Sequence, residues 1–263
     1  MSNTSPAVYL SLDVEEFDLP NEYGAALPLQ QQLDIGEEGF QATMPWLDQL
    51  GVCCTLFTTA RFAEHAPERI QEASTRHEIA SHGVRHDTFQ DEDYLHSKQR
   101  LEKVIGSEVV GFRMPRLQPI NSQACQAAGY HYDSSENPIR LPGRYDNRHL
   151  PRTPRMEEHL LRIPISTSPV LRLPLFWLAW GNIPRPLLRN ALDRALDADG
   201  QLILFFHPWE FIDLPTVPMP RIVRRRVGPR LKNIVEQELL RLAGKATFRP
   251  MRDLLTTPAA SPE

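Results

Sequence analysis

Short apolar runs alternate along the chain with longer segments in which apolar residues recur at helical spacing. The apolar runs predict strands at residues 7–12, 52–57, 78–80, 109–112, 130–133 and 201–206. The longer segments predict helices at residues 40–50, 67–73, 94–105, 121–128, 187–198 and 231–242, and Gly51, Gly106 and Gly129 stand at the ends of three of them. This order is typical of βαβ units, so we predict an α/β protein with a mostly parallel sheet.

The alternation is interrupted between residues 137 and 186. This segment is rich in proline and arginine and contains Phe176, Trp177 and Trp180. We interpret it as a long insertion that forms a lid or a wall of a substrate site. Since 41% of the 263 residues are hydrophobic, one sizeable core is expected, so residues 1–263 are predicted to form a single domain with a disordered tail after residue 255.

The composition limits which kinds of binding partner and which cellular compartment we expect for this protein. A net charge of −4 gives no overall attraction to nucleic acid, and three cysteines, two of them adjacent at Cys53 and Cys54, cannot form a disulfide framework. The polar residues 1–6 leave no room for an export signal before the first strand. The longest apolar run, residues 171–180, is about half the ~20 residues of a membrane span. We therefore expect a cytoplasmic protein with no nucleic-acid partner and no transmembrane helix.

An acidic cluster follows the first predicted strand, at residues 11–18. Side chains alternate along a strand, so Asp13 and Glu15 are expected on one face and Glu16 on the other. Carboxylates at the end of a parallel strand point to a site, because catalytic groups of α/β barrels gather there. The alternative is a solvated acidic loop.

Two histidines, His82 and His86, follow the third predicted strand at a spacing of four residues. If the segment turns helically, both imidazoles face one point, as a metal site requires. His77 lies on the strand side of this motif and is interpreted as a hydrogen-bonded core histidine.

Two further motifs follow predicted strands. Arg113 precedes Pro115, which forces the chain to turn, and its guanidinium can hold a catalytic carboxylate and lower the pKa of that group. His207 ends the strand at 201–206 and is placed for proton transfer, while Pro208 and Trp209 suggest a shaped pocket edge. The alternatives are a surface arginine and a capped core histidine.

These four motifs, in this order over residues 8–211, resemble the polysaccharide deacetylase family, also called the NodB-homology domain or carbohydrate esterase family 4. The resemblance implies a distorted (β/α) barrel with a divalent cation bound by two histidines and one carboxylate. It makes His82 and His86 ligands and Asp13 the base. The family's second aspartate is replaced here, so the ligand is Glu15 by the strand-face argument, with Glu16 as the alternative.

The resemblance also assigns roles outside the metal site. It implies that Arg113 orients the base, that His207 is the general acid, and that Asp133, in the sequence Tyr132 to Ser135, steadies His207. Arg116 and Trp209 are assigned to substrate binding. The cation, expected to be Zn²⁺ with Co²⁺, Fe²⁺ or Ni²⁺ as alternatives, would activate water whose proton Asp13 accepts, and His207 would protonate the departing amine.

We therefore predict a metal-dependent hydrolase that removes an acetyl or formyl group from an amino sugar or from its nucleotide-linked or lipid-linked precursor. Arginines at positions 221, 224, 225 and 226 could meet the phosphates of a membrane-linked substrate, or they serve only solubility. One alternative is a cyclic amide or ureide hydrolase, and another is a non-catalytic sugar-binding protein. The sequence does not predict an oligomeric state.

Overall fold

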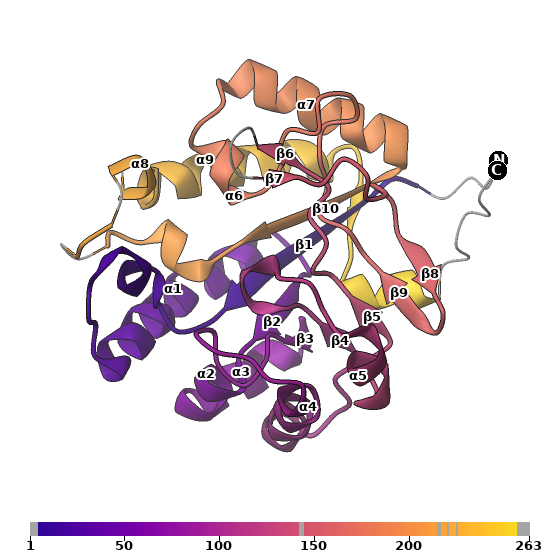
Figure 1. Cartoon of the computed structure of the whole chain (residues 1–263). Helices are drawn as coiled ribbons and strands as arrows, with labels where there is room; N and C mark the ends of the chain where they lie inside the picture. The colour runs from indigo at the N-terminus through magenta and orange to yellow at the C-terminus, as the bar shows by residue number, and fades with distance from the viewer. Residues whose placement is uncertain (1–4, 142–144, 215–216, 220, 225, 257–263) are drawn as a thin grey trace.

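A mostly parallel, nine-stranded sheet lies at the centre of the computed structural model, which describes residues 5–141, 145–214, 217–219, 221–224 and 226–256 (Figure 1). Its strands are β1 (Ala7–Val14), β2 (Thr55–Thr58), β3 (Glu78–Ser81), β4 (Gly111–Phe112), β5 (Tyr132–Asp133), β8 (Arg155–Glu157), β9 (Leu160–Arg162), β10 (Gln201–Phe206) and β11 (Thr247–Phe248). The order is β10-β1-β2-β3-β4-β5-β9-β8, with β11 also paired to β1. The curled, open sheet confirms the predicted distorted barrel.

Helices surround this sheet (Figure 1). They are α1 (Leu29–Gln49), α2 (Ala60–His65), α3 (Pro67–Ser74), α4 (Glu92–Ile105), α5 (Ser122–Ala127), α6 (Trp177–Trp180), α7 (Arg185–Asp199), α8 (Arg221–Arg224) and α9 (Pro229–Ala243). Short 3₁₀ turns are η1 (Leu19–Tyr23), η2 (Pro115–Leu117), η3 (Pro208–Phe211) and η4 (Met251–Leu255). No helix in the described ranges combines the length and apolar character needed to cross a bilayer.

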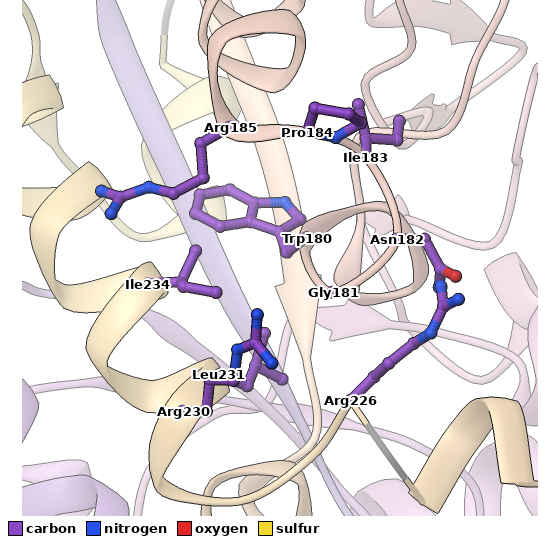
Figure 2. A pocket seen from close by; sticks show the side chains of 10 residues that line it. All are labelled: Trp180, Gly181, Asn182, Ile183, Pro184, Arg185, Arg226, Arg230, Leu231 and Ile234. Atoms are coloured by element: carbon purple, nitrogen blue, oxygen red, sulfur yellow. The ribbon is translucent and has the colours of Figure 1, made fainter.

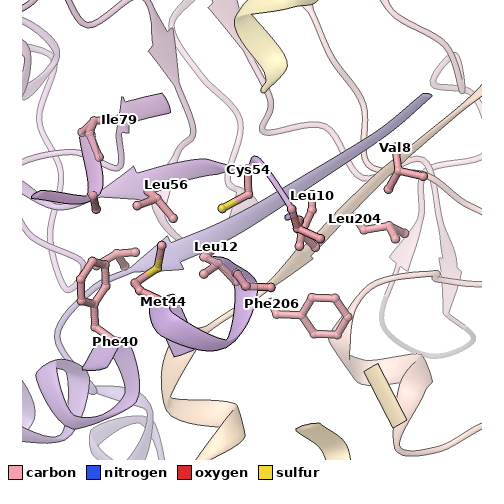
Figure 3. Packing of buried hydrophobic residues seen from close by; sticks show 14 of the residues in the cluster. Val8, Leu10, Leu12, Phe40, Met44, Cys54, Leu56, Ile79, Leu204 and Phe206 are labelled. Carbon is pink, nitrogen blue, oxygen red and sulfur yellow. The ribbon is translucent and has the colours of Figure 1, made fainter. Parts of the chain in front are cut away.

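Alternation along β1 and β10 sends side chains to two different cores. Val8, Leu10 and Leu204 belong to the large cluster that packs against the helices, in which Phe40 and Met44 of α1 also lie (Figure 3). The opposite face forms a second cluster inside the curve of the sheet, with Tyr9, Phe57, Tyr132, Ile203 and Phe205. Since Ser11 and Asp13 share the face of Tyr9, the interior of the curved sheet changes from apolar to polar toward the ends of the strands.

Helix α1 begins at Leu29, eleven residues before its predicted start. Gly36 and Gly39 lower helix propensity and hid this first half from the sequence pattern. Both are required by packing: a Cβ at Gly36 would lie 2.6 Å from the carbonyl oxygen of Glu15, and one at Gly39 would lie 2.6 Å from the backbone nitrogen of Trp209. The helix therefore supports the two chain segments that leave β1 and β10.

The segment at 137–186 is only partly an insertion. Its β9 pairs in parallel with β5, and β8 pairs with β9, so two of its strands extend the central sheet. The remainder includes β6 (Arg140–Leu141), β7 (Tyr145–Asp146) and α6. The strands and the helix of this segment are too short for the periodicity of apolar residues to predict them. The predicted disordered tail lies outside the described residues beyond position 256.

The buried strand β10 offers a direct test of the core. Leu204 is fully buried, so Leu204→Ala should lower the free energy of unfolding by about 2–5 kcal/mol. Leu187→Ala in α7 removes the same atoms from a side chain that is 62% exposed, and should change the free energy of unfolding by less than about 0.5 kcal/mol. Urea unfolding followed by circular dichroism compares the two variants, and equal effects would contradict this packing.

Candidate active site

The carboxyl ends of β1, β3 and β10 open into a cavity of about 750 Å³. Parallel strands place the residues that follow them at one edge of the sheet, which is why segments distant in sequence meet here. Part of the lining comes from the 137–186 segment. The lining includes Asp13, Glu15, Asp18, His82, His86, Arg116, Asn147, His149, Phe176, Trp177, His207 and Trp209. The segment therefore contributes to the lining of the cavity, and its role as a lid or a wall of a substrate site stays a prediction.

Glu15, His82 and His86 form a cluster suited to a metal ion. The Oε2 atom of Glu15 lies 3.2 Å from the Nε2 atoms of both His82 and His86, and one ligand atom from each residue falls within 4.8 Å of the others. Glu15 Oε2 is buried and has no hydrogen-bond partner among the described residues. Burial also raises the pKa of Glu15 well above its usual value. A divalent cation would satisfy this oxygen and favour the ionised carboxylate, so the donor set fits the implied group.

The Nδ1 atoms of His82 and His86, which face away from Glu15, each have a hydrogen-bond partner in the protein. His82 Nδ1 lies 2.9 Å from the carbonyl oxygen of Arg113, and His86 Nδ1 lies 2.8 Å from Asp18 Oδ1. Such partners fix the ring orientation and assign the proton to Nδ1, which leaves Nε2 free to donate electrons to a cation. Asp18 was not predicted for this role, although it stands in the same acidic run as Asp13.

The histidines do not converge by a helical turn, which was the expected geometry. Residues 82–86 form an irregular loop instead, with Gly83 at a φ of +80°. The loop is fixed by the start of α2, where the backbone nitrogens of Ala60 and Arg61 donate to the carbonyls of Gly83 and Val84. Tertiary hydrogen bonds therefore replace the helical ones.

Glu16 points away from the cluster. Its carboxylate accepts a 2.7 Å hydrogen bond from Thr59 Oγ1 and lies 3.2 Å from Arg61 Nη1. Alternation therefore continues past the end of β1, with Asp13 and Glu15 on one side and Glu16 on the other. This geometry favours Glu15 over Glu16 as the carboxylate that faces the two histidines.

Asp13 is paired with a fully buried guanidinium. Arg113 Nη1 donates to Asp13 Oδ1 at 2.5 Å, while Asp13 Oδ2 lies 4.0 Å from the Nε2 atoms of His82 and His207. Burial alone would raise the pKa of Asp13, but Arg113 and the two histidines outweigh it and hold the pKa below its usual value. Asp13 is therefore ionised at neutral pH, with Oδ2 directed to the site.

Arg113 is itself fixed by several groups. It donates to the carbonyl and hydroxyl oxygens of Ser134 and to Ser11 Oγ, each at 3.0 Å. Its Cζ atom also lies 4.0 Å from the ring centroid of Phe57. Hydrogen bonds and a cation–π contact thus compensate the burial of this charge.

His207 is held by Glu210 rather than by Asp133. Its Nδ1 atom lies 2.5 Å from Glu210 Oε1, which also accepts from the backbone nitrogen of His207 at 3.1 Å. Its Nε2 atom points toward the site, 3.8 Å from Glu15 Oε1. Burial lowers the pKa of His207 to about 3 and raises that of Glu210 well above its usual value. Burial thus favours the neutral forms of both groups, which share one proton between Nδ1 and Oε1.

The prediction that Asp133 steadies His207 is wrong. The Asp133 carboxylate accepts a 3.1 Å hydrogen bond from Arg162 Nε and another from Ser135 Oγ. Ser135 Oγ also accepts from the backbone nitrogen of Met114, so the Asp133 carboxylate is bound by Arg162 and Ser135 instead of by His207. Glu210 lies three residues after His207, which is the spacing of a capping box with His207 at the N-cap and Glu210 at N3. This spacing is a signal in the sequence from which the pair could have been predicted.

The two residues predicted to bind substrate both line the cavity. Trp209 stacks on the imidazole of His207, with ring centroids 5.0 Å apart. Arg116 forms ion pairs with Asp18 at 2.9 Å and Glu22 at 2.6 Å. Asp18 also holds His86, so Arg116 is connected through Asp18 to the cluster of Glu15, His82 and His86. The contact of Arg116 and Trp209 with a substrate stays a prediction.

The comparisons with known proteins agree with this architecture. Residues 31–132 match the family model for polysaccharide deacetylase, and none of the curated proteins compared matches the sequence. A Mycobacterium smegmatis protein classed as a polysaccharide deacetylase is 17% identical, with a TM-score of 0.68 over 100% of this chain and 97% of that one. PuuE allantoinase is 16% identical, with a TM-score of 0.67 over 98% and 96% of the two chains.

A third solved structure, from Pseudomonas aeruginosa PAO1 and also classed as a polysaccharide deacetylase, is 18% identical, with a TM-score of 0.66 over 95% and 89% of the two chains. At these identities the structures show a common fold. With the family model, they confirm the resemblance to the polysaccharide deacetylase family.

Metal titration separates the two candidate carboxylates. Glu15→Gln should weaken Zn²⁺ binding by more than about 100-fold, because loss of a ligand exceeds the 10–100-fold cost of losing an outer partner. Glu16→Gln, the matched control, should bind Zn²⁺ within about threefold of the wild type. Isothermal calorimetry on chelator-stripped protein, checked for folding by circular dichroism, gives both affinities. The opposite order would make Glu16 the ligand.

Proposed function

We propose that this chain is a metal-dependent amidohydrolase that removes an acetyl or formyl group from an amino sugar or from its nucleotide-linked or lipid-linked precursor. The observation that carries the proposal is the convergence of Glu15, His82 and His86 beside an ionised Asp13 and a partly buried His207. A base, an acid and a set of metal ligands are needed together for hydrolysis, whereas a sugar-binding protein needs none of them in this arrangement.

Asp13 and His207 would divide the proton transfers. Glu15, His82 and His86 would hold a divalent cation, which would supply Lewis acidity to the carbonyl oxygen and lower the pKa of the attacking water. Asp13 Oδ2 is free to accept the proton of that water, because Arg113 occupies Oδ1. The guanidinium also keeps this carboxylate in one orientation throughout the reaction.

The departing nitrogen needs a proton, since an amine does not leave as its anion at neutral pH. His207 Nε2, 4.0 Å from Asp13 Oδ2, is within reach of the same reacting group. As His207 donates from Nε2, the proton shared with Glu210 moves onto Nδ1. The pair can therefore deliver a proton without first forming a buried imidazolium.

The shape of the cavity favours a sugar-sized substrate. Its volume of about 750 Å³ lies in the upper part of the range of ~300–1,000 Å³ found for drug-sized ligands. Trp177 and Trp209 supply aromatic faces near His207, and Asn147 and His149 add polar groups to the lining. A small cyclic amide or ureide would leave much of this lining unused.

Product analysis tests the proposed reaction. Zn²⁺-loaded protein is incubated with acetylated and formylated amino sugars, free, nucleotide-linked and lipid-linked, and released acetate or formate is measured enzymatically. Release that stops on addition of a chelator supports the proposal. Opening of a cyclic amide or ureide without release of either acid would support the alternative hydrolase.

Removal of the base should separate binding of the metal from turnover. Asp13→Asn keeps the three proposed ligands, so Zn²⁺ affinity should stay within about threefold, while kcat should fall by roughly 10²–10⁴-fold. Asp146→Asn makes the same chemical change at an exposed site outside the cavity and should leave kcat unchanged. Acyl-release kinetics give kcat, and full activity of Asp13→Asn would exclude this base.

The partner of His207 can be identified by a second pair of variants. Glu210→Gln cannot pass a proton to Nδ1, so kcat should fall by at least about tenfold with little change in KM. Asp133→Asn breaks the pair with Arg162 and should lower stability more than it lowers kcat. Kinetics and urea unfolding of both variants distinguish the roles, and a larger kcat defect in Asp133→Asn would restore the family's usual arrangement.

A further inference from the structure

A second cavity, of about 420 Å³, lies between α6, α7 and α9 (Figure 2). Its lining consists of Trp180, Gly181, Asn182, Ile183, Pro184, Arg185, Arg226, Arg230, Leu231 and Ile234, and none of these residues lines the larger cavity. The short helix α6 separates the two, since Trp177 faces the larger cavity and Trp180 the smaller one. The second cavity is therefore distinct from the candidate active site.

Positive charge dominates this cavity. Three of its ten lining residues, Arg185, Arg226 and Arg230, are arginines, and none of the ten carries a carboxylate. The Nη1 atom of Arg226 and the Nε atom of Arg185 are buried and have no hydrogen-bond partner among the described residues. A buried guanidinium N–H without an acceptor is costly, so these atoms call for an anionic ligand.

The acidic group that pairs with Arg185 is shared with other arginines. The buried carboxylate of Glu238 lies 3.2 Å from Arg185 Nη2, but it also pairs with Arg189 at 2.6 Å and with Arg241 at 2.8 Å. Arg241 pairs with Asp193 at 2.6 Å as well, so two carboxylates face these three guanidinium groups. Glu238 does not neutralise the cavity, and Arg226 and Arg230 stay available to a ligand.

Backbone packing fixes the stem of Arg226. A Cβ on Gly181 would lie 2.7 Å from Arg226 Cβ and 3.1 Å from Cγ, so only glycine lets the two segments approach this closely. Figure 2 shows the guanidinium of Arg226 beside Asn182, on the side of Trp180 opposite Ile234. The Cβ and Cγ atoms of this arginine are thus packed against Gly181 before any ligand binds, which reduces the entropy lost on binding.

The rest of the lining is apolar. Trp180 is buried, and its Nε1 atom donates to the carbonyl of Leu175 at 2.9 Å, which leaves the ring to act as an apolar surface. Ile183, Leu231 and Ile234 complete this surface. Guanidinium groups bind phosphate oxygens in a bidentate manner, and an adjacent apolar wall accommodates an alkyl or isoprenoid chain.

We propose that this cavity is a binding site for a phosphate ester that carries an apolar group, with Arg226 and Arg230 contacting the phosphate and Trp180 and Ile234 contacting the chain. The site does not depend on the proposed hydrolysis. Its test measures binding alone, so failure of either proposal leaves the other standing.

Calorimetric titration of the full chain with hexyl phosphate and with inorganic phosphate tests the site. Hexyl phosphate should bind at least tenfold more tightly than inorganic phosphate, because the apolar wall adds to the charge contacts. Arg226→Gln should weaken hexyl phosphate binding at least tenfold. Arg194→Gln, which removes the same charge from an exposed position of α7, should leave it unchanged.

A second variant keeps the proposal testable if loss of Arg226 disturbs the fold. Ile234→Trp fills the cavity without changing any charge and should also abolish binding of hexyl phosphate. Equal affinity for the two phosphates, or binding that survives both Arg226→Gln and Ile234→Trp, would overturn the proposal.

Vesicles distinguish the source of the phosphate ester. Cosedimentation with phosphatidylcholine vesicles that contain phosphatidic acid, lost in Arg226→Gln, identifies a membrane-borne ester. Binding of hexyl phosphate without cosedimentation identifies a soluble one. Absence of both would overturn the proposal.

Discussion

The ion pair between Arg113 and Asp13 is the interaction on which the candidate site depends. Both side chains are almost completely buried, and such a charge is stable only when it is paired and hydrogen-bonded. The pair joins the end of β1 to the residue that follows β4, and the contacts of Arg113 with Ser134 extend it to the residue after β5. It therefore sets the relative positions of the strand ends from which the proposed catalytic groups project.

Negative charge around this pair exceeds the positive charge that the protein supplies. Arg113 pairs with Asp13, Arg61 with Glu16 and Arg116 with Asp18, but Glu15 faces only imidazoles. Of the four carboxylates in the acidic run at residues 13–18, only Glu15 has no ion pair with a guanidinium among the described residues. This pattern explains why the buried oxygen of Glu15 lacks a partner and why a divalent cation is the group that fits there.

Much of this arrangement could be predicted from the sequence, because it depends on rules of short range. Strand alternation separated Glu15 from Glu16, and the apolar run before His207 located β10 at Gln201–Phe206. The first half of α1 was missed, since tight packing at Gly36 and Gly39 demanded residues that are poor helix formers. Close packing of α1 against the segments after β1 and β10 outweighs the low helix propensity of these two glycines.

The hydrogen-bond partners of the proposed catalytic groups were harder to predict. Which carboxylate binds His207 depends on how the chain turns after β10, and that turn places Glu210 beside His207 Nδ1. Asp133 is instead bound by Arg162. Likewise, His82 and His86 meet through hydrogen bonds from Ala60 and Arg61 rather than through a helix. Long-range contacts of this kind leave no periodic signal in the sequence.

Anomalous X-ray diffraction from crystals of the Zn²⁺-loaded protein tests the central claim most directly. The account predicts one strong peak at about 2.0–2.2 Å from a carboxylate oxygen of Glu15 and from the Nε2 atoms of His82 and His86, with Asp13 outside bonding distance. A peak bound elsewhere, or no ordered metal at this cluster, would contradict the assignment of the site and the mechanism built on it.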